Sequence, residues 1–152
     1  MASKEPSCNA GEVIDLMTPN IVSVKPDTKI GEIWRLMTER RFRHMPVAKD
    51  DGRLLGIVSQ RDLLIAGRGS LAQDNRPVSE VMKRNIDTTR PNACAAEAAR
   101  HRLRSKRSGL PVVDAHGIVV GILTEADFLR LATRGAPPCT CGGVQAADTS
   151  HA

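Results

Sequence analysis

A seven-residue stretch occurs twice in this chain, as Gly56-Ile57-Val58-Ser59-Gln60-Arg61-Asp62 and as Gly121-Ile122-Leu123-Thr124-Glu125-Ala126-Asp127. In each copy an apolar, β-branched segment runs into an amphipathic one, which is typical of a strand that leads into a helix. Ser59 and Thr124 stand where an N-cap residue is preferred, and an aspartate follows three residues later, where a capping box has an acidic residue. The stretch therefore predicts two equivalent strand-to-helix junctions.

The same residues have a second interpretation, as parts of a nucleotide site. Free N–H groups at a helix start can bind phosphate, and a carboxylate one turn into the helix can accept two hydrogen bonds from a ribose diol. Helix capping alone explains the residue types. The coincidence of both motifs with basic clusters and with a long repeat favours at least one nucleotide site.

The two stretches belong to a gapless repeat with an offset of 65 residues, which also relates Pro46 to Pro111 and Met17 to Met82. This period is too long for a solenoid unit and indicates two copies of one supersecondary unit. Each copy is too short to bury a sufficient core alone, so we expect the copies to pack on each other.

Each copy reads as a short helix followed by the order βαββα, which predicts an α/β fold. The first strand is expected at Ile21–Val24 in one copy and Ile86–Thr88 in the other, and Asp27 or Thr28 is expected to cap the main helix of the first copy. The predicted organisation is a flexible N-terminus (1–10), repeat 1 (11–66), a linker (67–77), repeat 2 (78–132) and a flexible tail (133–152).

Composition restricts the function classes. The chain has 152 residues, a net charge of +5 and a pI of about 9.4, which favours anionic partners such as nucleotides, nucleic acids or acidic proteins. No apolar run approaches membrane length and the N-terminus lacks a hydrophobic signal core, so a cytoplasmic protein without membrane contact is expected.

The cysteines and histidines give little support to metal or catalytic chemistry. The four cysteines share no repeat position and predict neither a disulfide framework nor a complete zinc site. A metal or redox role for Cys139-Thr140-Cys141 with His151 stays open beside an inert tail. No nucleophile–base pair recurs in the repeats, so we expect no catalytic residues, no metal site and no catalytic cofactor.

Two copies of the order Met-x-x-Asn-Ile, Pro, an apolar-Pro-Val strand and G-h-x-[S/T]-x-x-D resemble a tandem cystathionine-β-synthase (CBS) domain pair of the stand-alone type, over roughly Gly11 to Ala132. The resemblance implies two pseudo-symmetric CBS repeats packed sheet to sheet. It also implies a regulatory module, not an enzyme, that binds an adenosyl ligand and signals its state to a separate effector protein. AMP, ADP and ATP are the expected ligands, and NAD or S-adenosylmethionine are alternatives.

The family pattern also implies the residues of two nucleotide sites. It implies that the motif aspartates bind the ribose hydroxyls. It implies that Ser59, Thr124 and the residues before each Pro-Val strand face the phosphate, and that the first strand and the motif isoleucines line the adenine pocket. Site 1 comprises Val22, Arg43, His44, Ile57, Ser59 and Asp62; site 2 comprises Asp87, Arg107, Ser108, Ile122, Thr124 and Asp127.

Two acidic residues distinguish the copies. Repeat 2 has Asp87 where repeat 1 has Val22, and Glu125 where repeat 1 has Gln60. Because both carboxylates would lie near phosphate, we expect the second site to be weaker or to prefer a less anionic ligand.

Two expectations concern partners. A homodimer is predicted, with the Ala-rich face of residues 95–99 and the closing helices Gln60–Ile65 and Glu125–Ala132 as candidate surfaces; the dimer orientation stays open. The alternative function is nucleic-acid binding through the basic clusters at 40–44 and 100–107. The low aromatic content, 2%, disfavours it, because stacking platforms need aromatic side chains.

Overall fold

The computed structural model describes residues 11–67, 69–105 and 109–133. In each half a long helix precedes a β-hairpin and a shorter helix follows it. The elements are α1 (Val13–Leu16), β1 (Thr18–Pro19), α2 (Ile30–Arg40), β2 (His44–Ala48), β3 (Leu54–Ser59), α3 (Gln60–Ala66), η1 (Leu71–Gln73), η2 (Val78–Glu80), α4 (Ala95–Ser105), β4 (Gly109–Val113), β5 (Val119–Thr124) and α5 (Glu125–Thr133).

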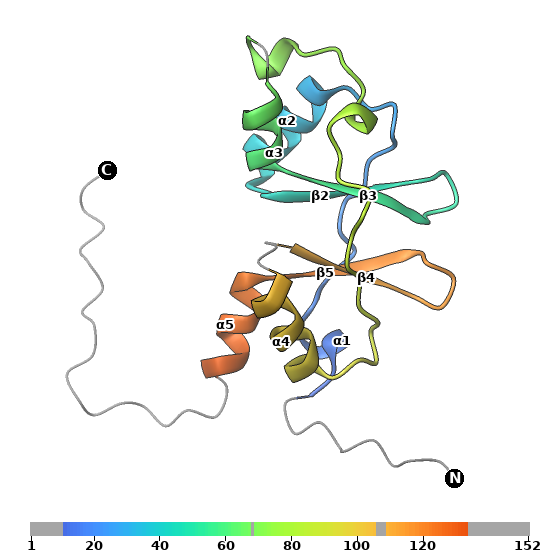
Figure 1. The fold of residues 1–152 in the computed structure, drawn as a ribbon, viewed down its shortest axis with the longest axis vertical. Helices are drawn as coiled ribbons and strands as arrows, with labels where there is room; N and C mark the ends of the chain where they lie inside the picture. The colour runs from blue at the N-terminus through green and yellow to red at the C-terminus, as the bar shows by residue number, and fades with distance from the viewer. Residues whose placement is uncertain (1–10, 68, 106–108, 134–152) are drawn as a thin grey trace, which may run out of the picture.

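Two small sheets face each other at the centre of the molecule, and the helices lie on their outer sides (Figure 1). Strands β2 and β3 form one antiparallel sheet, and the other has the order β1-β5-β4. The hairpin ends join through an isolated bridge between Arg53 and Ile118, with Leu54 N–H donating to the Gly117 carbonyl at 3.0 Å. This arrangement confirms the predicted α/β fold with two pseudo-symmetric repeats packed sheet to sheet.

The first half has a core of large aliphatic side chains. Ile30, Ile33 and Met37, spaced i, i+3 and i+7 on α2, are buried against the β2–β3 sheet. Each such burial contributes about 1.5–3 kcal/mol of transfer free energy. The second half has Ala95 and Ala98 at the first two of these positions, so α4 buries less apolar surface than α2.

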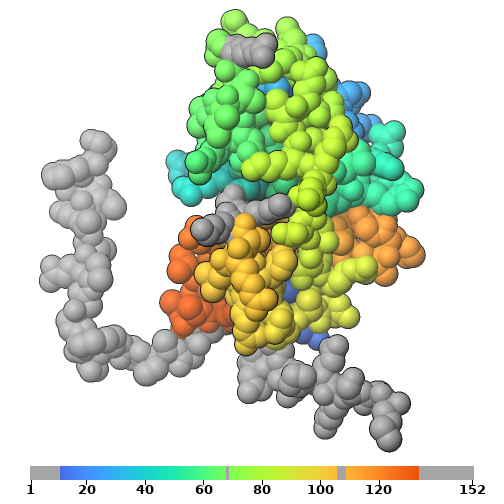
Figure 2. All heavy atoms as spheres, in the orientation of Figure 1, coloured from blue at the N-terminus to red at the C-terminus, as the bar shows by residue number. Residues whose placement is uncertain are grey.

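The short N-terminal segments of the two repeats are exchanged. Val13 and Leu16 of α1 belong to the core formed by α4, β4 and β5, whereas Val78 and Met82 belong to the core formed by α2, β2 and β3. Strand β1 accordingly pairs with β5, Thr18 opposite Ile122. On the face shown in Figure 2, the yellow-green segment after η2 runs from one half to the other. Each core therefore contains residues from both sequence repeats.

The glycine that opens each repeated stretch makes this crossing possible. A Cβ at Gly56 would lie 2.7 Å from the Met82 sulfur and 2.9 Å from the Lys83 carbonyl oxygen. A Cβ at Gly121 would meet Met17 and Thr18 in the same way. Glycine is required at both positions because the crossing backbone passes directly over the strand.

Several local expectations were wrong. The strands expected at Ile21–Val24 and Ile86–Thr88 are reduced to single parallel bridges, Val24 with Val47 and Thr89 with Val112. A proline follows each bridge two residues later and has no N–H to continue a ladder.

The first-copy cap and the cysteine expectation were wrong as well. Helix α2 begins after Lys29 without a side-chain cap, because the Thr28 hydroxyl instead accepts a hydrogen bond from Lys25 N–H. Cys94 is disulfide-bonded. The predicted N-terminus (1–10) and residues 134–152 of the predicted tail, with Cys139-Thr140-Cys141, lie outside the described residues, whereas Thr133 ends α5.

Candidate functional site

The first motif forms a closed capping box at the start of α3. Asp62 N–H donates to Ser59 Oγ at 3.0 Å, and Ser59 N–H donates to Asp62 Oδ2 at 2.9 Å. The Asp62 side chain keeps 13% of its surface exposed. The carboxylate therefore serves as a cap and still reaches solvent.

A lysine from the other repeat meets this carboxylate. Lys83 Nζ lies 3.0 Å from Asp62 Oδ1, because the backbone of Lys83 pairs with Ile57 on β3. Burial, the largest single influence, raises the pKa of the Asp62 carboxyl, but the hydrogen bonds with Ser59 and the ion pair with Lys83 hold it below its ordinary value. Asp62 is therefore ionised at neutral pH.

The carboxylate of the second motif has more protein partners and less exposure than that of the first. Asp127 Oδ2 accepts from Thr124 N–H at 2.8 Å and from Thr124 Oγ1 at 3.0 Å, and Oδ1 is paired with Arg130. Asp127 is fully buried. The two equivalent aspartates thus differ in access: Asp62 is open to solvent and Asp127 is not.

Two basic residues of the first repeat lie beside the first motif. The Arg43 carbonyl accepts from Gln60 N–H at 2.9 Å, and His44 pairs with Ser59 across the β2–β3 ladder. Burial lowers the pKa of His44, and the charges of Arg102, Arg43 and Lys83 lower it further against the opposing effect of Asp62. His44 is therefore neutral at pH 7 and surrounded mainly by cations.

His44 also marks the pseudo-twofold axis. A Cβ at Gly109 would lie 3.1 Å from Cγ of His44, and Gly109 is its equivalent in the second repeat. Because equivalent residues touch only near the axis that relates them, the imidazole lies between the two halves. The missing side chain at Gly109 leaves room for the ring.

Sequence reasoning did not assign Arg102 to a site. This α4 residue interacts electrostatically with both His44 and Glu125, and its Nη1 is buried with no hydrogen-bond partner among the described residues. Burial lowers the pKa of its guanidinium, opposed by Glu125. The guanidinium places a third cation near His44, beside Arg43 and Lys83.

The remaining predicted residues are placed as follows. Ile57 and Ile122 are buried and Val22 is half-buried. Asp87 Oδ2 lies 3.3 Å from His101 Nε2. Within the described residues, an ion pair joins the first motif to Lys83 of repeat 2, and backbone pairing joins the second motif's strand to Thr18 of repeat 1. Arg107 and Ser108 lie outside the described residues.

Two segments of this chain, residues 12–69 and 78–134, match the family described as CBS domain. The chain belongs to the CBS domain family. It is a tandem CBS pair, and the match spans both halves of the fold.

Solved structures of other CBS pairs resemble this one closely. One is CBSX2 in complex with AMP, with a TM-score of 0.74 and 34% identity; the match covers 82% of this chain and 97% of that one. Another is the CBS domain pair of protein MJ0100 in complex with 5'-methylthioadenosine and S-adenosyl-L-methionine, with a TM-score of 0.71, 29% identity and coverage of 80% and 94%. Adenosyl ligands thus bind to these two related pairs.

Curated relatives include much longer proteins. The chain is 34% identical to homoserine O-acetyltransferase of Methanohalobium evestigatum, with 78% of this chain covering 24% of that protein. It is 32% identical to chloroplastic CBSX2 of Arabidopsis thaliana, with coverage of 84% and 66%. This CBS pair therefore spans about a quarter of the length of some relatives and two thirds of another.

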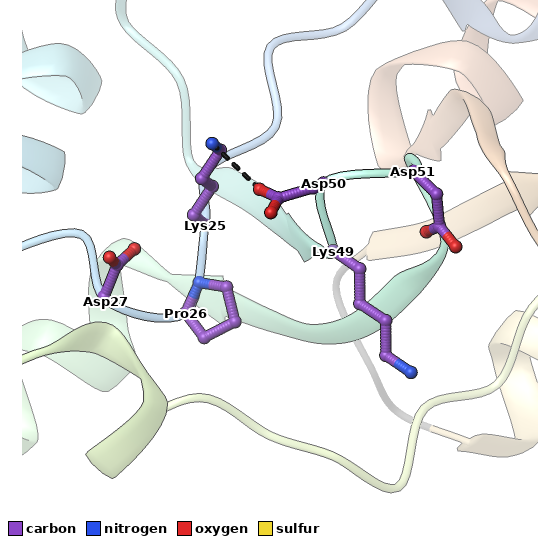
Figure 3. A pocket seen from close by; sticks show the side chains of 6 residues that line it. All are labelled: Lys25, Pro26, Asp27, Lys49, Asp50 and Asp51. Carbon is purple, nitrogen blue, oxygen red and sulfur yellow. Dashed lines mark ion pairs between the residues drawn. The ribbon is translucent and has the colours of Figure 1, made fainter.

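Two surface hollows of the CBS pair lie apart from the described residues of the predicted sites. One of about 670 Å³ is lined by Lys25, Pro26, Asp27, Lys49, Asp50 and Asp51, with Lys25 and Asp50 paired at 2.8 Å (Figure 3). A smaller one of about 210 Å³ lies beside α4. Neither is lined by a predicted site residue, so the assignment depends on the motifs and their charges.

The described residues contain no group of three or more His, Cys, Asp or Glu side chains able to hold a metal ion. Among the same residues, no helix is both long enough and apolar enough to cross a membrane.

Proposed function

We propose that this CBS pair is a regulatory module that binds an adenosyl nucleotide and passes its ligand state to a separate effector protein in the cytoplasm, without catalysis of its own. One observation carries the proposal: the ionised, solvent-accessible Asp62 lies in a helix-start motif with Arg43, His44 and Lys83 around it. The AMP complex of CBSX2 and the S-adenosyl-L-methionine complex of MJ0100 support it.

In this proposal the Asp62 carboxylate binds the ribose. An ionised carboxylate offers about four acceptor positions. Lys83 uses one acceptor position of Oδ1, and Ser59 N–H uses one acceptor position of Oδ2. The remaining acceptor positions are available to the two hydroxyls of a ribose diol. Phosphate lies towards Arg43, Lys83 and Ser59, and the purine packs on Ile57.

The complete proposed sites keep the residues implied by the family pattern. Site 1 is Val22, Arg43, His44, Ile57, Ser59 and Asp62, and site 2 is Asp87, Arg107, Ser108, Ile122, Thr124 and Asp127. The ion pair of Lys83 with Asp62 supports a contribution of the opposite repeat to site 1.

A thermal-shift titration with AMP, ADP, ATP, NAD and S-adenosylmethionine tests the function. An adenosyl ligand at about a hundred times its Kd should stabilise the protein by about 2.7 kcal/mol. Guanosine monophosphate and inorganic phosphate are the controls. No stabilisation by any adenosyl compound at millimolar concentration, or equal stabilisation by the guanosine control, would contradict the proposal.

We further propose that the pair is a homodimer formed through its closing helices. Leu64 on α3 and its equivalent Leu129 on α5 are 59% and 65% exposed, and Ile65 beside them is 74% exposed. The Ala-rich face is not available for this purpose, because Ala95 and Ala98 are buried in the second core. Apolar side chains repeated on both closing helices are typical of a surface covered by a second subunit.

Replacing both Leu64 and Leu129 with aspartate should convert the dimer to a monomer, as measured by light scattering at micromolar concentration. Leu103→Asp is the matched control, since Leu103 is 82% exposed but lies on α4 and not on a closing helix. A wild-type monomer with and without nucleotide would refute the proposed dimer.

A further inference from the structure

Arg102 occupies a position that the fold uses for a core side chain. It lies 65 residues after Met37, which is 1% exposed in the first core. On α4 it continues the buried stripe of Ala95 and Ala98 with the spacing i, i+3, i+7. An arginine has thus replaced a methionine on the inward face of the helix.

This replacement is unfavourable for folding alone. The Nη1 atom of Arg102 is buried and has no hydrogen-bond partner among the described residues. A buried donor of a charged group without an acceptor costs free energy that an apolar side chain would not. Ala95 and Ala98, which precede Arg102 in the same stripe of α4, have no side-chain acceptor to offer. An anion brought by a ligand would satisfy the donor.

The surroundings of the guanidinium indicate where that anion lies. Arg102 interacts electrostatically with His44, at the start of β2, and with Glu125, the first residue of α5. His44 pairs with Ser59 of the first motif, and its ring meets Gly109 of the second repeat. The side chain therefore extends from α4 towards the junction of the two repeats, on the side of the Asp62 motif.

We propose that Arg102 recognises the phosphate of a ligand whose ribose is bound at Asp62, and that it makes this pair select phosphorylated over uncharged adenosyl ligands. The inference rests on the proposed function and adds a residue from the opposite repeat to site 1. The planar guanidinium donates to phosphate oxygens beside Arg43 and Lys83, since charge-assisted bonds of this kind are strong. Glu125 balances its charge before the ligand arrives.

Calorimetric titration of wild type, Arg102→Met and Arg102→Lys with AMP and with adenosine tests the inference. Arg102→Met installs the residue that the first repeat has at this position, so it should fold with at least wild-type stability in a urea titration. Its AMP affinity should fall by about tenfold or more, while its adenosine affinity changes less than about twofold. Arg102→Lys keeps the charge without the planar fork and should fall between the two.

Three other outcomes overturn the inference. If wild type binds AMP and Arg102→Met binds it equally well, Arg102 does not contact phosphate and the proposed function stands. If Arg102→Met loses AMP and adenosine affinity by the same factor, its role is structural. If wild type binds neither ligand, the proposed function fails as well. If Arg102→Met folds poorly, the ratio of AMP affinity to adenosine affinity is measured for Arg102→Lys and compared with wild type. An unchanged ratio overturns the inference, and a lowered ratio supports it.

Discussion

Asp62→Ala is expected to weaken AMP binding by about tenfold or more, whereas Asp127→Ala should lower stability more than affinity. The Asp62 carboxylate is ionised, accessible to solvent and paired with Lys83. Loss of this carboxylate removes the acceptor proposed for the ribose hydroxyls. A hydrogen bond to a charged group contributes about 1.5–3 kcal/mol, which corresponds to tenfold or more in affinity.

The reason for the opposite behaviour at Asp127 is its burial. Its carboxylate already accepts from Thr124 twice and is paired with Arg130, with no exposed surface. Truncation would leave the Thr124 N–H and hydroxyl without an acceptor, at a cost of about 1–3 kcal/mol in the free energy of unfolding.

Calorimetry with AMP on both variants, together with urea titrations, measures the two effects separately. The matched pair controls for capping, because both alanine variants lose a helix-capping carboxylate. Equal losses of affinity, or a larger loss in Asp127→Ala, would count against the asymmetry of the sites.

The sequence predicts the fold and the candidate site well wherever the interactions are local. The capping box at Ser59 and Asp62, the two hairpins and the buried α2 stripe all follow from residue patterns within short, continuous segments of the chain. Such contacts depend on residues that are close along the chain, so the pattern alone specifies them. The cap of α2 was wrong for a local reason too: Thr28 had a competing turn partner in Lys25.

The contacts between repeats could not be predicted in this way. A 65-residue period has the same appearance whether each short helix packs on its own repeat or on the other one. The ion pair of Lys83 with Asp62 and the pairing of Thr18 with Ile122 exist only because the segments are exchanged. Arg102 was missed although a signal was present: aligned with Met37, it is a charged residue in a buried register.

The exchange leads to a prediction about fragments of the chain. A fragment of residues 21–87 should fold more stably than one of residues 11–77, which has the same length. The first contains every buried member of the core around α2, including Val78 and Met82. The second carries α1 without the core that α1 packs into, and ends before Val78. The loss of Val78 and Met82 should cost about 3–6 kcal/mol, since burial of one such side chain contributes about 1.5–3 kcal/mol.

Circular dichroism during thermal unfolding measures the difference. Because a domain of this size is marginally stable, a loss of this magnitude should convert a cooperative transition into a gradual one. Val13→Asp, made in both the full chain and the 11–77 fragment, is the control: it should destabilise the full chain, where Val13 is fully buried in the second core, and leave the fragment unchanged. A cooperative 11–77 fragment as stable as 21–87 would show that the sequence repeat, not the exchanged unit, is the unit of folding.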